Sequence, residues 1–188
     1  MRSRSNRERG AAAVETALVA LVLIFLTVGA AEYGLAMRDH LSVTGATREG
    51  ARVGAAAGDE PGADCRILEA TAGGLQSLDA DEVMEVRVFE ANPLTGRQMR
   101  YRPSVSGDDP VKLRCGGGWF EIESSWLEST RDNDGVDRDW LGVEVVFDHD
   151  WLTGVFLFDG SACSRGTVVG VECWSQETIM HIEPDPTP

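Results

Sequence analysis

The fold is decided by the stretch RGAAAVETALVALVLIFLTVGAA, residues 9–31. From Ala11 to Ala31 this stretch holds one ionisable residue, Glu15, among apolar, small and hydroxyl-bearing neighbours. A helix over these residues, at about 1.5 Å per residue, is roughly 30 Å long and can cross the hydrocarbon core of a bilayer. Four arginines precede Gly10, and a basic flank on the short side predicts that this end stays in the cytoplasm. We therefore expect a single-pass membrane protein whose larger part, after Ala31, is extracytoplasmic.

Glu15 needs a reason to stand inside an apolar span, because a carboxylate there costs about 2.5–3.5 kcal/mol on insertion scales. One interpretation is a glutamate that snorkels to the cytoplasmic headgroups, since it lies about one turn inside the segment. The other interpretation depends on Gly10. If the chain is cut between Gly10 and Ala11, Glu15 becomes the fifth residue of the mature protein.

A basic leader, a glycine at the cut and a glutamate at the fifth mature position resemble the processing signature of type IV pilin-like proteins. The resemblance implies cleavage by a prepilin peptidase at Gly10/Ala11. It also implies that Glu15 guides assembly by pairing with the new α-amino group of a neighbouring subunit.

Three motifs in order make the N-terminal region, roughly residues 9–57, similar to TadE-like proteins, the minor pseudopilins of the tight-adherence (Flp) pilus assembly system. The first is GAAAVETAL from Gly10, with Thr16 where many relatives carry an aromatic residue. The other two are AEYG, residues 31–34, and ATREGAR, residues 46–52. The residues that carry these two are Glu32, Tyr33, Gly34, Arg48, Glu49, Gly50 and Arg52. The implied partners are other pilins or pseudopilins, the membrane platform that assembles the pilus, and the prepilin peptidase.

The pattern along the chain predicts an α+β fold: a long N-terminal transmembrane and amphipathic helix followed by a small antiparallel β-sheet domain, as in pilins. We divide the chain into a leader (1–10), a membrane helix (11–34), an amphipathic continuation (35–58), a disulfide-bonded β-rich domain (59–183) and a proline-rich tail (184–188). A short amphipathic helix is expected from Ala63, ending near Gly73–Gly74 or near Leu78. Strands are expected over 83–89, 97–103, 119–126 and 141–147, and within 168–183.

Small residues recur every four positions along the continuation of the helix, at Ala46, Gly50, Gly54 and Gly58. Each interior glycine costs up to about 1 kcal/mol relative to alanine. Close packing on a partner helix, or on the β domain of the same chain, would recover that cost. The alternative is that Gly45 and Gly50 break the helix. Glu49 is within i, i+3 reach of Arg52.

Four cysteines lie in the part expected to be exported, where an oxidising environment favours disulfides. Cys163 and Cys173 are close in sequence around a turn-like stretch, so we pair them and, by remainder, Cys65 with Cys115. Zinc is the alternative, but the chain has no C-x-x-C pair and its three histidines are scattered.

The rest of the sequence offers little chemistry. The net charge of −14 argues against binding to phosphate backbones, so no nucleic acid is expected. The acidic run over 131–139 invites comparison with a calcium loop, but aligning Gly135 as its glycine puts Leu141 where a bidentate glutamate belongs; a solvated loop is the preferred interpretation. Five tryptophans favour sheet packing over a carbohydrate-binding platform, and in one regular strand Trp119 and Trp126 would point to opposite faces.

No nucleophile elbow, histidine triad or phosphate loop is present in the sequence, so we expect no enzyme, no metal and no cofactor.

The first hypothesis for function is a structural component in the assembly of a Flp/Tad-type pilus or secretion machine, with a role in adhesion. The second is an uncleaved, signal-anchored binding module. A third is ordinary secretion after cleavage behind Ala31, although the apolar run exceeds a usual signal peptide core of about 7–15 residues.

Overall fold

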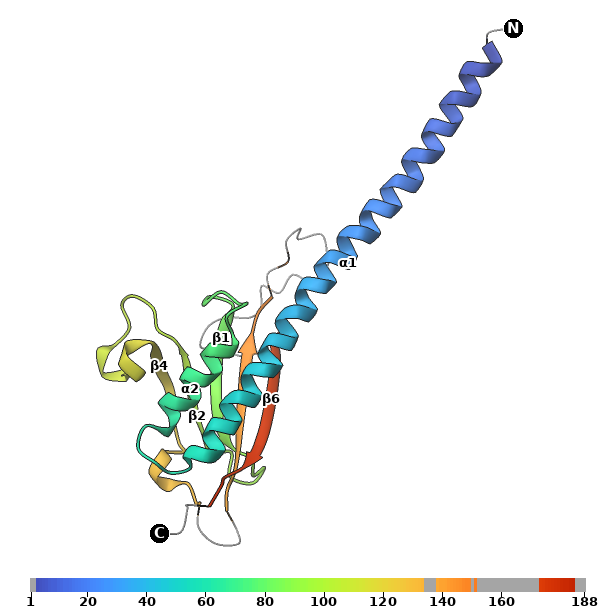
Figure 1. Cartoon of the computed structure of the whole chain (residues 1–188). Helices are drawn as coiled ribbons and strands as arrows, with labels where there is room; N and C mark the ends of the chain where they lie inside the picture. The colour runs from blue at the N-terminus through green and yellow to red at the C-terminus, as the bar shows by residue number, and fades with distance from the viewer. Residues whose placement is uncertain (1–2, 134–137, 150, 152–172, 185–188) are drawn as a thin grey trace. The chain divides into compact units, whose positions relative to one another are not determined.

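The computed structural model describes residues 3–133, 138–149, 151 and 173–184. They fold into a long N-terminal apolar helix, a second helix and a six-stranded antiparallel sheet (Figure 1), so the predicted α+β class is confirmed. The chain divides into two compact units, Met1–Arg38 and Asp39–Pro188. The first unit is helical, and the second holds the sheet.

Helix α1, Ser3–Ala57, begins before the predicted membrane segment because the arginines and glutamate of the leader are good helix formers. Gly45 and Gly50 do not break it. It ends where predicted, at Gly58, whose φ of 53° is a left-handed conformation that glycine adopts without strain. The Gly58 N–H donates to the Gly54 carbonyl at 3.0 Å, which satisfies one of the last carbonyls of the helix.

Helix α2, Ala63–Gly74, and the last part of α1 cover one face of the sheet (Figure 1). The strands, in the order β3-β4-β2-β1-β5-β6, are all antiparallel to their neighbours. Their bounds are β1 Val83–Glu90, β2 Gln98–Pro103, β3 Leu113–Arg114, β4 Trp119–Ser124, β5 Trp140–Phe147 and β6 Trp174–His181. Single-turn 3₁₀ helices occur at η1 Pro110–Lys112, η2 Cys115–Gly117 and η3 Glu128–Thr130.

The core of the second unit lies between the helices and the sheet. Alternate strand residues such as Val86, Val88 and Val143 point to the helices and are fully buried against Ile67 and Leu68 of α2. The opposite face of the sheet carries charged side chains, of which Glu85 in β1 is itself buried and pairs with Arg87 and Arg100. One face of the sheet is therefore apolar and the other ionic, as expected for an antiparallel sheet covered on one side.

The structure corrects the strand predicted over 119–126 and the interpretation of its two tryptophans. The strand predicted over 119–126 ends at Ser124, so Trp126 follows it and is fully buried, while Trp119 is half-buried against the same core. The two tryptophans therefore do not define opposite faces of one strand. The two-residue strand β3 was not predicted, because it is too short to show a period of two.

The run over 131–139 is not simply a solvated loop. Its first residue, Arg131, is 4% exposed, and Asn133 is 6% exposed. Residues 134–137, which include Gly135, lie outside the described residues, as do the start of the last predicted strand (168–172) and most of the proline-rich tail.

Candidate functional site

The apolar part of α1 leaves its large side chains uncovered within the described residues. Leu18, Leu21 and Phe25 are 63%, 69% and 57% exposed. Among the described residues, α1 is the one helix that is long enough and apolar enough to cross a membrane, judged by its length and composition. It is consistent with a single-pass membrane protein, and the uncovered side chains are what lipid or neighbouring apolar helices would contact.

The polar side chains in this stretch are accommodated locally. The Thr16 hydroxyl donates to the Ala12 carbonyl and the Thr27 hydroxyl to the Ile24 carbonyl, both at 2.8 Å. Glu15 is exposed on the same helix, and it has no ion-pair partner among the described residues. An acid in this position therefore depends on a group from outside the described chain, or on the headgroup region, for compensation of its charge.

The structure places the predicted motif residues along α1. Gly10 and Ala11 lie within the helix, and Tyr33, in the step from Glu32 to Gly34, is 70% exposed. Further along, the arginines and the glutamate of the third motif are exposed.

Two of these exposed charges make the ion pair that the spacing predicts. The Arg52 guanidinium donates to both carboxylate oxygens of Glu49, at 2.6 and 2.9 Å, and this hydrogen bonding lowers the pKa of Glu49. Both side chains face solvent, so the pair contributes little to stability.

The small-residue row on the other side of α1 packs on the domain of the same chain. A Cβ added to Gly50 would overlap the Thr71 hydroxyl of α2. One added to Gly54 would lie 2.8 Å from Leu141 Cδ2 and 2.9 Å from Ile67 Cδ1. The sequence left open whether the small residues pack on a partner helix or on the chain's own domain. At Gly50 and Gly54 they pack on the domain.

Gly74, the last residue of α2, lies equally close to the backbone of α1. A Cβ on Gly74 would lie 2.7 Å from the Cα of Ala46, a backbone atom that cannot turn aside. The glycines therefore let two helix backbones come closer than any side chain would allow.

A buried polar group ties α2 to the sheet and to the loop after η3. Asp64 forms an ion pair with Arg131, and the Tyr101 hydroxyl donates to Asp64 at 2.6 Å. Burial raises the pKa of Asp64, against the opposing effect of the Arg131 charge. Burial and the Asp64 charge also raise the pKa of Tyr101. The Arg131 guanidinium lies 4.8 Å from the ring centre of Trp126, which adds a cation–π contact.

Sequence reasoning missed this group. Asp64 and Arg131 are 67 positions apart, and no local pattern links them. The one available signal was an arginine at the start of an acidic run, which we interpreted as solvated.

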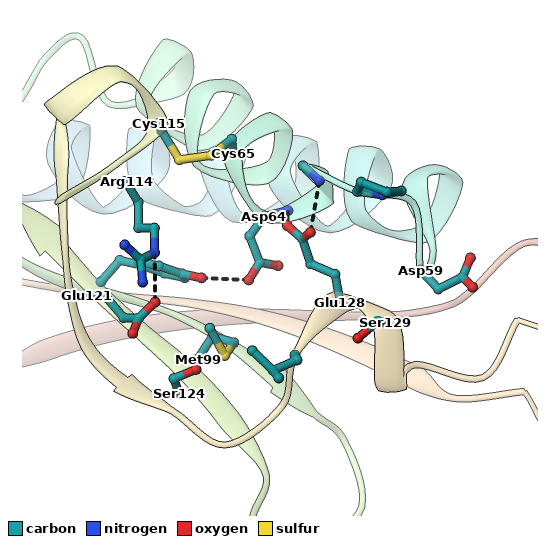
Figure 2. A pocket seen from close by; sticks show the side chains of 14 residues that line it. Asp59, Asp64, Cys65, Met99, Arg114, Cys115, Glu121, Ser124, Glu128 and Ser129 are labelled. Atoms are coloured by element: carbon teal, nitrogen blue, oxygen red, sulfur yellow. Dashed lines mark hydrogen bonds and ion pairs between the residues drawn. A yellow bond between two sulfur atoms is a disulfide. The ribbon is translucent and has the colours of Figure 1, made fainter. Parts of the chain in front are cut away.

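Cys65 and Cys115, which the sequence analysis paired, form a disulfide between α2 and η2 (Figure 2). Cys173 is also disulfide-bonded, and its predicted partner Cys163 lies outside the described residues. Beside the Cys65–Cys115 bond is a cavity of about 450 Å³.

Carboxylates that line this cavity accept hydrogen bonds that join different elements of the fold (Figure 2). Glu128 accepts the backbone N–H groups of Gly62 and Asp64, at 2.8 and 2.7 Å, and so caps the start of α2. Glu121 accepts from Arg114 at 2.9 Å. No group of three or more potential metal ligands occurs among the residues that the structure describes. Glu128 therefore fastens η3 to the start of α2, and Glu121 fastens β4 to β3.

The comparisons with known proteins agree with the motifs at the N-terminus. The family model for TadE-like protein matches residues 10–52. No curated protein and no solved structure matches the chain. The matched range runs from Gly10 to Arg52, includes Glu15 and ends five residues before the end of α1. The resemblance to the TadE-like family is confirmed for this range, which includes every motif residue inferred from the sequence, and we refer to residues 10–52 as the TadE-like segment.

Proposed function

We propose that this protein is a minor pseudopilin, a structural component in the assembly of a Flp/Tad-type pilus or secretion machine that serves adhesion. The observation that carries the proposal is the TadE-like segment over residues 10–52. The exposed apolar helix within that segment supports it, because such a surface needs lipid or other helices around it.

In this proposal, a prepilin peptidase cuts between Gly10 and Ala11. The cut removes the basic leader and creates an α-amino group at the start of the apolar helix. Glu15 then pairs with the α-amino group of a neighbouring subunit, so that two charges that are costly in lipid compensate each other.

The proposal also specifies the orientation of the chain in the membrane, its partners and its role. The N-terminus faces the cytoplasm, and the domain that starts after the membrane segment is extracytoplasmic, where disulfides persist. Its partners are other pilins or pseudopilins and the membrane assembly platform. The role is structural: it requires neither catalysis nor a cofactor.

The test is the N-terminal residue of the protein recovered from its native cell envelope. A chain that starts at Ala11 supports the proposal. A chain that starts at Met1 contradicts it and favours an uncleaved, signal-anchored binding module. A chain that starts near Glu32 contradicts it as well, and indicates a secreted domain.

Three variants test processing and assembly separately. Gly10→Val should leave the leader attached, whereas Gly45→Ala, an exposed glycine with open space around it, should be processed like the wild type. Glu15→Ala should be cut normally but should be lost from the assembled fraction. If Glu15→Ala assembles at the wild-type level, the glutamate is a snorkelling acid and has no role in assembly.

A further inference from the structure

The two edges of the sheet differ in how well they are protected against another strand. At one edge, β3 has two residues and runs directly into η2, where Cys115 and two glycines have positive φ. At the other edge, β6 has eight residues paired to β5 without a register shift. It contains neither lysine nor proline, two residues that commonly block exposed edges. The edge formed by β6 is therefore suited to accept a further strand.

Hydrogen bonding in the neighbouring strands decides which backbone groups of β6 are open. The Ala91 N–H donates to the Trp140 carbonyl at 2.7 Å, so Trp140 directs its backbone groups towards β1. Because these directions alternate along a strand, the odd-numbered residues of β5 bond to β6, and their partners on β6 are even-numbered. The open backbone groups therefore belong to the odd-numbered residues: Ser175, Glu177, Ile179 and His181.

These positions are accessible. Within the described part of the chain, no backbone group is bonded to them, and the Ser175 carbonyl accepts a single hydrogen bond from the Gln176 side chain, at 2.6 Å. The side chains of Ser175, Glu177 and Ile179 are exposed, Ile179 by 43%. A strand laid along this edge would meet both free main-chain groups and available side chains.

The charge at the centre of the edge decides what kind of strand fits. Glu177 lies directly opposite Glu144, and Glu144 already accepts from Arg87 at 2.8 Å. Glu177 has no ion-pair partner among the described residues. Like charges opposite each other disfavour pairing, so Glu177 favours a partner residue of positive charge.

A second copy of this chain is a poor partner for the same reason. An antiparallel pairing of two β6 edges centred on Glu177 would set two glutamates face to face, in a chain of net charge −14. A strand with a cationic residue at that point has the opposite preference. A cavity of about 410 Å³, lined in part by Phe89, Glu177 and Ile179, offers room beside the edge for a long side chain.

We propose that the free edge of β6 binds an extended strand of another protein that carries a lysine or arginine opposite Glu177 and an apolar residue opposite Ile179. Main-chain hydrogen bonds would supply affinity, and the two side-chain positions would supply selectivity. The proposal does not depend on the pilus assignment, since β6 lies outside the TadE-like segment.

The test uses the full-length protein in detergent micelles and two synthetic peptides. The probe is acetyl-Thr-Thr-Val-Thr-Lys-Thr-Val-Thr-Thr-amide, whose symmetry allows either strand direction, and the comparison peptide has glutamate in place of lysine. Amide hydrogen exchange is followed by NMR along β6. Without peptide, the amides of Ser175, Glu177 and Ile179 should exchange at least ten-fold faster than those of the even-numbered residues. Saturation with the lysine peptide should abolish that difference.

The lysine peptide should bind roughly ten-fold more tightly than the glutamate peptide, and Glu177→Lys should reverse the preference. Glu69→Lys is the control, because it changes the net charge equally at an exposed position on α2 and should leave the preference unchanged. The proposal is overturned if the odd-numbered amides are already protected in the isolated protein, or if neither peptide slows their exchange. It is also overturned if Glu177→Lys does not change the preference, or if protection rises with protein concentration alone, which would indicate self-pairing.

Discussion

Replacing Gly50 by alanine should destabilise the domain that α1 forms with the sheet, although alanine is the better helix former. In an exposed helix the change would gain about 1 kcal/mol. Here the new Cβ overlaps the hydroxyl of Thr71, which is fully buried and donates to the Ile67 carbonyl at 2.8 Å. Overpacking costs about 1–3 kcal/mol, and loss of the hydrogen bond adds about 0.5–1.5 kcal/mol. We expect a net loss of about 1–3 kcal/mol in the free energy of unfolding.

Two further variants separate the clash from other effects. Gly45→Ala lies on the same helix with nothing within 4 Å of the new Cβ, and should stabilise the protein by about 0.5–1 kcal/mol. In the double variant Gly50→Ala/Thr71→Ala the overlapping hydroxyl is absent. The next atoms, Thr71 Cβ and Val143 Cγ1, are at 3.5 and 3.4 Å, which is ordinary contact. In the Thr71→Ala background the Gly50→Ala change should therefore be neutral or stabilise by up to about 1 kcal/mol, which gives a coupling energy of about 1–4 kcal/mol.

The assay is urea unfolding of the full-length protein in detergent micelles, followed by tryptophan fluorescence. Trp126 is fully buried in the core and reports on its loss. The slopes of the transitions should stay the same among the variants, so that midpoints report stability. If Gly50→Ala is as stable as Gly45→Ala, or if Thr71→Ala does not relieve the cost, the close packing of α1 on α2 does not constrain Gly50.

Three further outcomes are expected from the same assay. Joint replacement of Cys65 and Cys115 by alanine should lower the free energy of unfolding by about 4 kcal/mol, because the disulfide closes a loop of 50 residues; an unchanged midpoint would contradict this. Asp64→Ala should cost about 3–5 kcal/mol by leaving Arg131 buried without its partner, whereas adding Arg131→Met should recover part of that loss rather than add to it. Glu90→Gln should destabilise near neutral pH, and its difference from the wild type should shrink as the pH falls below the ordinary pKa of a glutamate in the unfolded chain, about 4.3; a difference independent of pH would refute this.

The sign of the Glu90 prediction follows from its contacts. Glu90 accepts hydrogen bonds from Arg97 at 2.7 Å and from the Thr95 hydroxyl at 2.5 Å. The bond from Arg97 is the main reason that the pKa of Glu90 is lowered in the folded protein. An acid whose pKa is lower when folded stabilises the fold above its unfolded pKa, and this stabilisation is lost as the pH falls through the folded value.

Prediction succeeded where the signal lies in consecutive residues. The apolar length of α1, its end at Gly58 and most strands follow from runs and periods that neighbouring residues carry themselves. The i, i+3 pair of Glu49 and Arg52 belongs to the same class, because helix geometry alone brings those side chains together.

Prediction failed where the partners are distant or the element is very short. Strand β3 has two residues and cannot show a period. The alternation of its neighbours predicts a strand that includes Trp126, whereas the strand ends at Ser124 and the ring is buried in the core.

The sequence by itself determined that a membrane-length helix leads into an antiparallel sheet, because hydrophobic length and periodicity are local properties. Only the tertiary structure decided that Gly50 and Gly54 pack on the chain's own domain, and that Asp64 meets Arg131 in the core. It alone also decided that β6 is left at the edge of the sheet. These outcomes depend on which segments meet across the fold, and that choice is made by the burial of the whole core rather than by any one stretch of residues.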